Sequence, residues 1–180
     1  MRCFIAIDLP DEVKKELTEI QKKIPIEDTK IINVKPEIMH LTLRFLGEVD
    51  SENVNKIKLI LNSLKVKQFK AKLSSIGIFP DENFIRVVWV GLEPKEKFKE
   101  IYDLIENELS KIKIEGDSRF ESHVTLSRVK FVKDKKKFIE KLKKIEIKPI
   151  EFTVDNIKLK MSSLTSNGPV YNDLFSTKAY

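Results

Sequence analysis

The spacing of apolar and histidine positions is the feature that most constrains the fold of this chain. Three pairs show it: Pro10 and Pro94 are 84 residues apart, Leu17 and Ile101 are 84 apart, and His40 and His123 are 83 apart. This period is much longer than that of a solenoid repeat, so it predicts two similar lobes. We therefore expect one two-lobed domain over residues 1–180, with internal pseudo-repeats at roughly 1–80 and 84–163.

Each pseudo-repeat is predicted to contain a strand, a helix, a histidine strand, a helix and a strand. Pro10, Ser51 and Pro94 are expected to begin helices whose apolar residues recur on one face, and a lysine-rich helix follows the second histidine. Strands are expected at 3–9, 41–49, 69–79, 86–92, 123–131 and 150–161, with loops near 80–83 and 167–169. The predicted fold class is α+β, with two antiparallel sheets flanking a central cleft and helices outside.

The composition indicates a globular protein with a localised positive charge. No apolar run reaches the roughly 18 residues that span a bilayer, and Asp8 interrupts the apolar N-terminus, so a cytoplasmic protein is expected. The net charge is +6, yet residues 128–148 alone hold ten basic and three acidic residues, or +7. Such a segment attracts a polyanion toward a nearby site. The alternative is a solvated helix face that carries lysines for solubility.

The only two histidines lie in the same four-residue frame, "HLTL" at 40–43 and "HVTL" at 123–126. Alternate side chains of a strand point to the same face. His40 and Thr42 should therefore share one face of their strand, as should His123 and Thr125 of theirs. If the lobes are related by an approximate twofold axis, both polar faces line one cleft.

These residue types favour acid and base chemistry without a metal. A zinc site needs three or four ligands, which two histidines and the single Cys3 do not supply, and the five glycines are too dispersed for a phosphate loop. Two imidazoles on opposite sides of a phosphorus atom can run an in-line displacement, one as base and one as acid. With ordinary pKa values near ~6.5, one neutral and one protonated form can coexist near neutral pH. Threonine hydroxyls can hold the non-bridging oxygens.

Two H-x-T-L tetrads about eighty residues apart resemble the two-histidine (2H) phosphoesterase superfamily. The segments "RCFIAIDLP", "HLTLRFLGEV", "GIFP", "RVVWVGL", "HVTLSRVKF" and "SSLTSNGPVY" are similar to its LigT/ThpR branch, the RNA 2′,3′-cyclic phosphodiesterases also called 2′-5′ RNA ligases. The resemblance implies a bilobal fold and hydrolysis of terminal 2′,3′-cyclic phosphates of RNA, such as tRNA-derived ends, to 2′-phosphomonoesters. It also implies 2′-5′ ligation by some members. No metal and no cofactor are implied.

By this resemblance His40 is the proton donor to the leaving 3′-oxygen, His123 is the base that activates water, and Thr42 and Thr125 hold the phosphate. Strand alternation places Arg44 on the face of His40, where it meets a phosphate or lies at the rim. Arg128 has the opposite parity from His123, which favours a structural ion pair unless a bulge intervenes. Phe79 and Tyr171 either stack on a base or, by default, pack in the core.

Other functions remain open at this point. The same chemistry would serve a phosphodiesterase of small cyclic phosphates or of 2′-5′ oligonucleotides. A non-catalytic binder of RNA ends is a further alternative, which the two intact tetrads disfavour. We expect a monomer that acts on RNA and does not contact a membrane.

Overall fold

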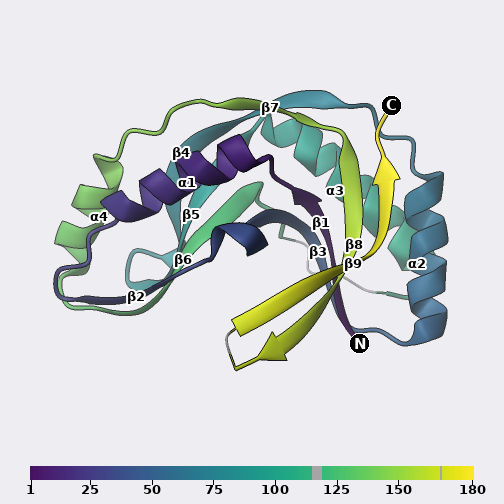
Figure 1. Ribbon diagram of the computed structural model, residues 1–180, viewed down its shortest axis with the longest axis horizontal. Coiled ribbons are helices and arrows are strands. Elements are labelled where there is room, and N and C mark those ends of the chain that lie inside the picture. Colours follow the sequence, from purple (N-terminus) through teal and green to yellow (C-terminus); the bar gives the residue numbers. More distant parts are fainter. Residues whose placement is uncertain (115–118, 167) are drawn as a thin grey trace.

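The computed structural model describes residues 1–114, 119–166 and 168–180, and Figure 1 shows a curved antiparallel sheet with helices along its outer side. Gly116 and Asn167, which entered the glycine and loop predictions, lie outside these residues. The strand order is β7-β4-β5-β6-β3-β1-β8-β9, and β2 also pairs with β6. The strands are β1 (Arg2–Asp8), β2 (Thr29–Asn33), β3 (His40–Glu48), β4 (Phe69–Asp81), β5 (Phe84–Glu93), β6 (His123–Val132), β7 (Glu151–Val154), β8 (Asn156–Thr165) and β9 (Gly168–Lys178).

The sheet has two halves, which in the described part of the chain are joined at one residue pair. β3, β1, β8 and β9 form the His40 lobe, and β7, β4, β5, β6 and β2 form the His123 lobe. The halves meet where Leu41 of β3 pairs with Val124 of β6. The predicted two-lobed α+β architecture is confirmed, with the two expected sheets joined at this pair into one curved sheet.

The last strand of each predicted pseudo-repeat lies in the opposite lobe. β4 follows the first histidine strand along the chain but pairs with β5 of the His123 lobe, and β8 pairs with β1 of the His40 lobe. The single strand predicted at 150–161 is therefore wrong. The chain leaves the sheet at Asp155, so that β7 pairs with β4 in one lobe and β8 pairs with β1 in the other.

The predicted helices are present, and their apolar faces form the core against the sheet. They are α1 (Asp11–Lys23), α2 (Ser51–Ser63), α3 (Lys95–Lys111) and α4 (Lys135–Lys143), with a short 3-10 turn at Pro36–Ile38. Val13, Leu17 and Ile20 of α1 are fully buried, as their spacing predicts. The N-cap of α2 is Asp50 rather than the expected Ser51, because the Asp50 carboxylate accepts a hydrogen bond from the Asn53 backbone N–H.

Two strands were not predicted. β2 is short and carries exposed Ile32, so it lacks the alternating pattern of the other strands, and β9 is rich in polar residues. The predicted loop near 80–83 is confined to Glu82 and Asn83, since Pro80 pairs with Ile85 inside the β4–β5 hairpin. Over the residues that the structure describes, no helix has the length and apolar character needed to cross a membrane.

Candidate active site

The two histidine frames lie side by side where the lobes join. Leu41 and Val124 form the connecting pair and are fully buried on the helix-covered side of the sheet. The residues on either side of each therefore point to the opposite, concave face. Antiparallel register around this pair sets His40 across from Thr125 and Thr42 across from His123. The structure therefore brings the two frames together in a crossed arrangement of two imidazoles and two hydroxyls.

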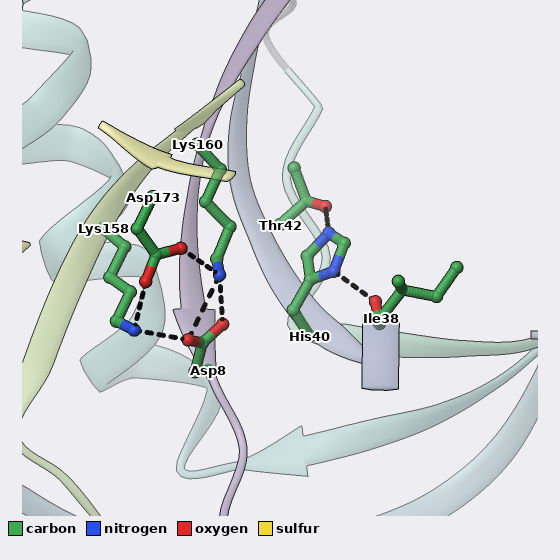
Figure 2. A network of polar contacts seen from close by, with 7 residues as sticks. All are labelled: Asp8, Ile38, His40, Thr42, Lys158, Lys160 and Asp173. Atoms are coloured by element: carbon green, nitrogen blue, oxygen red, sulfur yellow. Dashed lines mark hydrogen bonds and ion pairs between the residues drawn. The ribbon is translucent and has the colours of Figure 1, made fainter. Parts of the chain in front are cut away.

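Both imidazoles are held in the same tautomer by backbone carbonyls. Nδ1 of His40 lies 2.7 Å from the Ile38 carbonyl oxygen, and Nδ1 of His123 lies 2.8 Å from that of Glu121. A carbonyl only accepts, so each Nδ1 carries the proton and donates. In the neutral ring Nε2 is then an acceptor, and Nε2 of His40 accepts a hydrogen bond from the Thr42 hydroxyl at 2.9 Å (Figure 2). Each histidine therefore presents Nε2 as its reactive atom.

Burial makes both imidazoles weaker bases than a histidine in water. It lowers the pKa of His40 to about 4, with the Ile38 hydrogen bond opposing the shift and the charge of Lys160 adding to it. Burial also lowers the pKa of His123, against the opposing effect of the Glu121 carbonyl. Both rings are consequently neutral in the free protein near neutral pH. The expectation of one neutral and one protonated ring therefore does not describe the free protein near neutral pH.

Aromatic rings pack against each imidazole. The ring of His40 lies 4.9 Å from that of Phe4 and 5.3 Å from that of Tyr171. The ring of His123 lies 4.9 Å from Phe79 and 5.8 Å from the indole of Trp89. Tyr171 and Phe79 meet their histidines edge-on, so they are walls of the histidine site rather than members of the helix-side core. These rings restrict how each imidazole can tilt and account for its desolvation.

A bulge follows the threonine in the first frame and overturns the prediction for Arg44. The register of β1 with β3 shifts between Thr42 and Arg44, so Leu43 is the extra residue. Arg44 then points to the helix side, where it is 8% exposed and its Nε donates to the Glu106 carboxylate of α3. Arg44 is a structural group that joins the sheet to α3 and does not reach the concave face.

The second frame has the same bulge, with the opposite consequence for Arg128. The register of β5 with β6 shifts between Thr125 and Ser127, which makes Leu126 the extra residue. Arg128 pairs with Val87, two residues from Trp89 on the same face of β5, so it shares the concave face with Thr125. It is exposed and has no ion-pair partner among the described residues. The predicted structural ion pair of Arg128 is wrong, because the bulge was not visible in the sequence.

A network of four charges lies beside His40 on the concave face (Figure 2). Asp8 of β1 pairs with His40, and its carboxylate lies 2.9 Å from Lys160 Nζ and 2.8 Å from Lys158 Nζ. Asp173 of β9 contacts the same two lysines at 2.7 and 2.5 Å. Burial raises the pKa of Asp8, but hydrogen bonds from the lysines outweigh burial and hold it below its ordinary value. The network therefore stays ionised and fixes two lysines next to His40.

The family follows from a comparison with known proteins. A family model described as LigT like Phosphoesterase matches the chain twice, at residues 7–89 and 90–171, with one histidine frame in each match. The chain belongs to the LigT-like phosphoesterase family. The double match agrees with the long-range repeat of the sequence, although the exact limits of the pseudo-repeats stay a prediction.

Relatives of this LigT-like chain resemble it over nearly its whole length. It is 41% identical to a protein of Methanocaldococcus jannaschii named RNA 2′,3′-cyclic phosphodiesterase, over 95% of this chain and 96% of the relative. A protein of Thermotoga maritima with the same name is 38% identical over 97% and 94%. In structure, the chain resembles TT0787 of Thermus thermophilus with a TM-score of 0.83 at 29% identity, covering 99% and 97% of the two chains.

Several neighbours of the histidines were not predicted from the sequence. Phe4 and Trp89 lie on strands far from the tetrads along the chain, and only sheet pairing brings them next to the imidazoles. The same holds for Asp8 and Lys160, which are 152 residues apart. Alternation within "RVVWVGL" places Trp89 and Gly91 on one face of their strand. It does not tell which strand lies beside them. Within the described ranges, no cluster of three or more His, Cys, Asp or Glu side chains is arranged to hold a metal ion.

Proposed function

We propose that this LigT-like protein hydrolyses terminal 2′,3′-cyclic phosphates of RNA to 2′-phosphomonoesters with its two histidines as acid and base. The observation that carries the proposal is the crossed pair of frames, in which two imidazoles with locked Nδ1 present Nε2 to one concave face. The names of the relatives support the choice of substrate. Both imidazoles come from one chain, so we also propose that a monomer is active.

In the proposed reaction a water oxygen attacks phosphorus while Nε2 of His123 takes the proton of that water. The bond from phosphorus to the 3′-oxygen breaks, and protonated Nε2 of His40 gives its proton to that oxygen. This division of roles is carried over from the family pattern of the two tetrads. Thr42 and Thr125 donate hydrogen bonds to the non-bridging oxygens, where negative charge grows in the transition state.

Charge explains how His40 becomes an acid. Its pKa of about 4 in the free protein leaves it neutral, whereas a bound phosphate anion favours the protonated imidazole and raises that pKa. Arg128, exposed on the same face without an ion-pair partner among the described residues, supplies positive charge that attracts the anion. Substrate binding therefore prepares the acid, while His123 keeps its lone pair for water.

The same geometry extends to ligation. A 5′-hydroxyl in place of the attacking water would give a 2′-5′ linkage by the same proton transfers. The helices α1 to α4 lie along the outer side of the sheet (Figure 1), so none of them lies between the histidine frames and a second RNA end on the concave face. We propose that hydrolysis is the main reaction, because water is far more concentrated than any RNA end.

The test uses an oligonucleotide that ends in a 2′,3′-cyclic phosphate, with excess EDTA. Wild type should release a product with a 2′-phosphate, and His40→Ala and His123→Ala should each lose at least ~10²-fold in kcat. A 3′-phosphate product would overturn the assignment of the leaving oxygen. Full activity in either variant would overturn the two-histidine mechanism, and tight binding without any product would favour the non-catalytic RNA-end binder.

A further inference from the structure

An exposed stripe continues from the histidine site along β2 and β6. Ile32 of β2 pairs with Arg128, and Lys30 pairs with Phe131. Cross-strand partners share a face, so Lys30, Ile32 and Phe131 lie on the concave face with Arg128. Lys130 is the extra residue at the shift between the Val129 and Phe131 pairs and is also exposed. We call Lys30, Ile32, Lys130 and Phe131 the β2–β6 stripe.

The opposite face of the same strands confirms this orientation. Val129 of β6 is 2% exposed, and its partner Ile31 packs against the core. The stripe instead exposes 52% of Ile32 and 57% of Phe131 to solvent. Contiguous exposed apolar surface is a feature of interaction sites, and these two side chains lie on the same face as Arg128.

The stripe is also positively charged. Lys30 and Lys130 are exposed, and neither has an ion-pair or hydrogen-bond partner among the described residues. By contrast, two lysines of α4 farther along the basic segment are engaged: Lys141 lies 2.9 Å from Glu27 and Lys143 lies 3.4 Å from Glu82. Within the basic segment 128–148, the charge of Lys130 is therefore unpaired among the described residues, whereas the charge of α4 is partly neutralised.

The length of the stripe separates it from the site of the reaction. Phe131 is six residues beyond Thr125 on β6, which corresponds to at most roughly 20 Å of strand. A nucleotide held by the histidines does not reach that far. A chain of nucleotides that leaves the site on this side would pass over Arg128 and then over the stripe.

We propose that the β2–β6 stripe binds the single-stranded RNA that precedes the terminal cyclic phosphate, an inference that rests on the proposed function. Unpaired bases stack on Phe131 and pack on Ile32, while Lys30 and Lys130 contact backbone phosphates. A surface that combines an aromatic ring, an aliphatic side chain and two cationic groups suits a single strand, whose bases and phosphates are both accessible. The stripe makes the protein prefer an oligonucleotide end over a cyclic mononucleotide.

Two double variants test the stripe, and both leave Arg128 and the tetrads intact. Ile32→Ala/Phe131→Ala removes the stacking surface, and Lys30→Ala/Lys130→Ala removes the charges. The matched controls are Leu59→Ala, because Leu59 of α2 is 72% exposed, and Lys65→Ala just beyond that helix. In Figure 1, α2 and β2 lie at opposite ends of the molecule. Thermal melting of each variant checks that it folds.

Each protein is assayed on a 2′,3′-cyclic mononucleotide and on an eight-nucleotide RNA with the same end. The stacking variant should lose about 5- to 150-fold in kcat/KM on the RNA, the range for one stacked base, and less than about two-fold on the mononucleotide. For the lysine variant, the slope of log affinity against log salt should fall by roughly 1.4, as expected for two phosphate contacts to a single strand. The controls should match wild type on both substrates.

Binding of an RNA that already ends in a 2′-phosphate, followed by fluorescence anisotropy, separates the two proposals. If wild type turns over neither substrate, the proposed function fails, and weaker RNA binding by the stripe variants still supports the stripe. If wild type is active and the stripe variants bind and cleave the RNA as wild type does, the stripe proposal is overturned and the proposed function stands. An equal loss on mononucleotide and RNA also overturns it, because the defect then lies at the histidines.

Discussion

Replacing Gly77 by alanine tests the packing that holds His123. Gly77 of β4 pairs with Trp89 of β5, and the indole lies directly against the glycine backbone. A Cβ at position 77 would lie 2.2 Å from Cζ2 and 2.5 Å from Cε2 and Cη2 of that ring. Carbon atoms in contact are about 3.5 Å apart, so the indole would have to move by more than about 1 Å.

This displacement reaches the reactive group. The indole of Trp89 lies 5.8 Å from the imidazole of His123 and 4.9 Å from the ring of Phe79, which itself lies 4.9 Å from the imidazole. Overpacking of this kind costs about 1–3 kcal/mol, which corresponds to roughly 2–12 °C in Tm for a chain of this size. A shift of about 1 Å in a catalytic group lowers kcat by up to ~10²-fold.

The assay measures Tm and kcat on a cyclic-phosphate RNA for Gly77→Ala, Trp89→Phe and the double variant. Phenylalanine lacks the outer ring that carries the clashing atoms. The double variant should therefore be more stable than the sum of the two single effects predicts, by at least about 0.5 kcal/mol. Wild-type Tm and kcat in Gly77→Ala, or strictly additive effects in the double variant, would refute the reasoning.

Three further predictions concern charge. Arg44→Ala should lower the unfolding free energy by roughly 2–4 kcal/mol, a value discounted for the partial exposure of Glu106, and should leave kcat within about two-fold of wild type. A large loss of kcat at unchanged Tm would show instead that Arg44 contacts the phosphate. The pKa of His40 is lowered to about 4, and burial also lowers the pKa of His123 from its ordinary value. The maximum of kcat/KM should therefore lie at acidic pH, and a maximum above pH 7 would contradict the assignment. Lys160→Met removes a positive charge, so it should raise the pKa of His40 and move the low-pH limb of the profile to higher pH. Asp8→Asn removes a negative charge, so it should lower that pKa and move the limb to lower pH. Shifts of the same sign in the two variants would show that these charges do not act on His40.

The local pattern of the sequence was sufficient to predict which side chains of each histidine frame share a face. Alternation along a strand has a period of two residues and needs no knowledge of the partner strand, so it placed His40 with Thr42 and His123 with Thr125. Helical spacing fixed the buried faces of α1, α2 and α3 for the same reason. The long-range repeat also predicted that the two frames belong to one site, which the Leu41–Val124 pair explains.

Local alternation failed where pairing with another strand decides the geometry. The bulges at Leu43 and Leu126 come from the registers with β1 and β5, and each reverses the face of the residues that follow. For that reason Arg44 is buried against α3 while Arg128 faces the site, the reverse of both predictions. The same pairing splits the strand predicted at 150–161 between the two lobes.

The sequence alone thus determined which side chains share a face within each histidine frame, since residue identity and short-range periodicity are written along one strand. The tertiary structure decided what surrounds them. The aromatic walls of Phe4 and Trp89, the ionised network of Asp8 and Lys160, and the β2–β6 stripe all join residues from strands that are distant along the chain. Their proximity depends on register and strand order, which are set by the packing of the whole sheet against its helices.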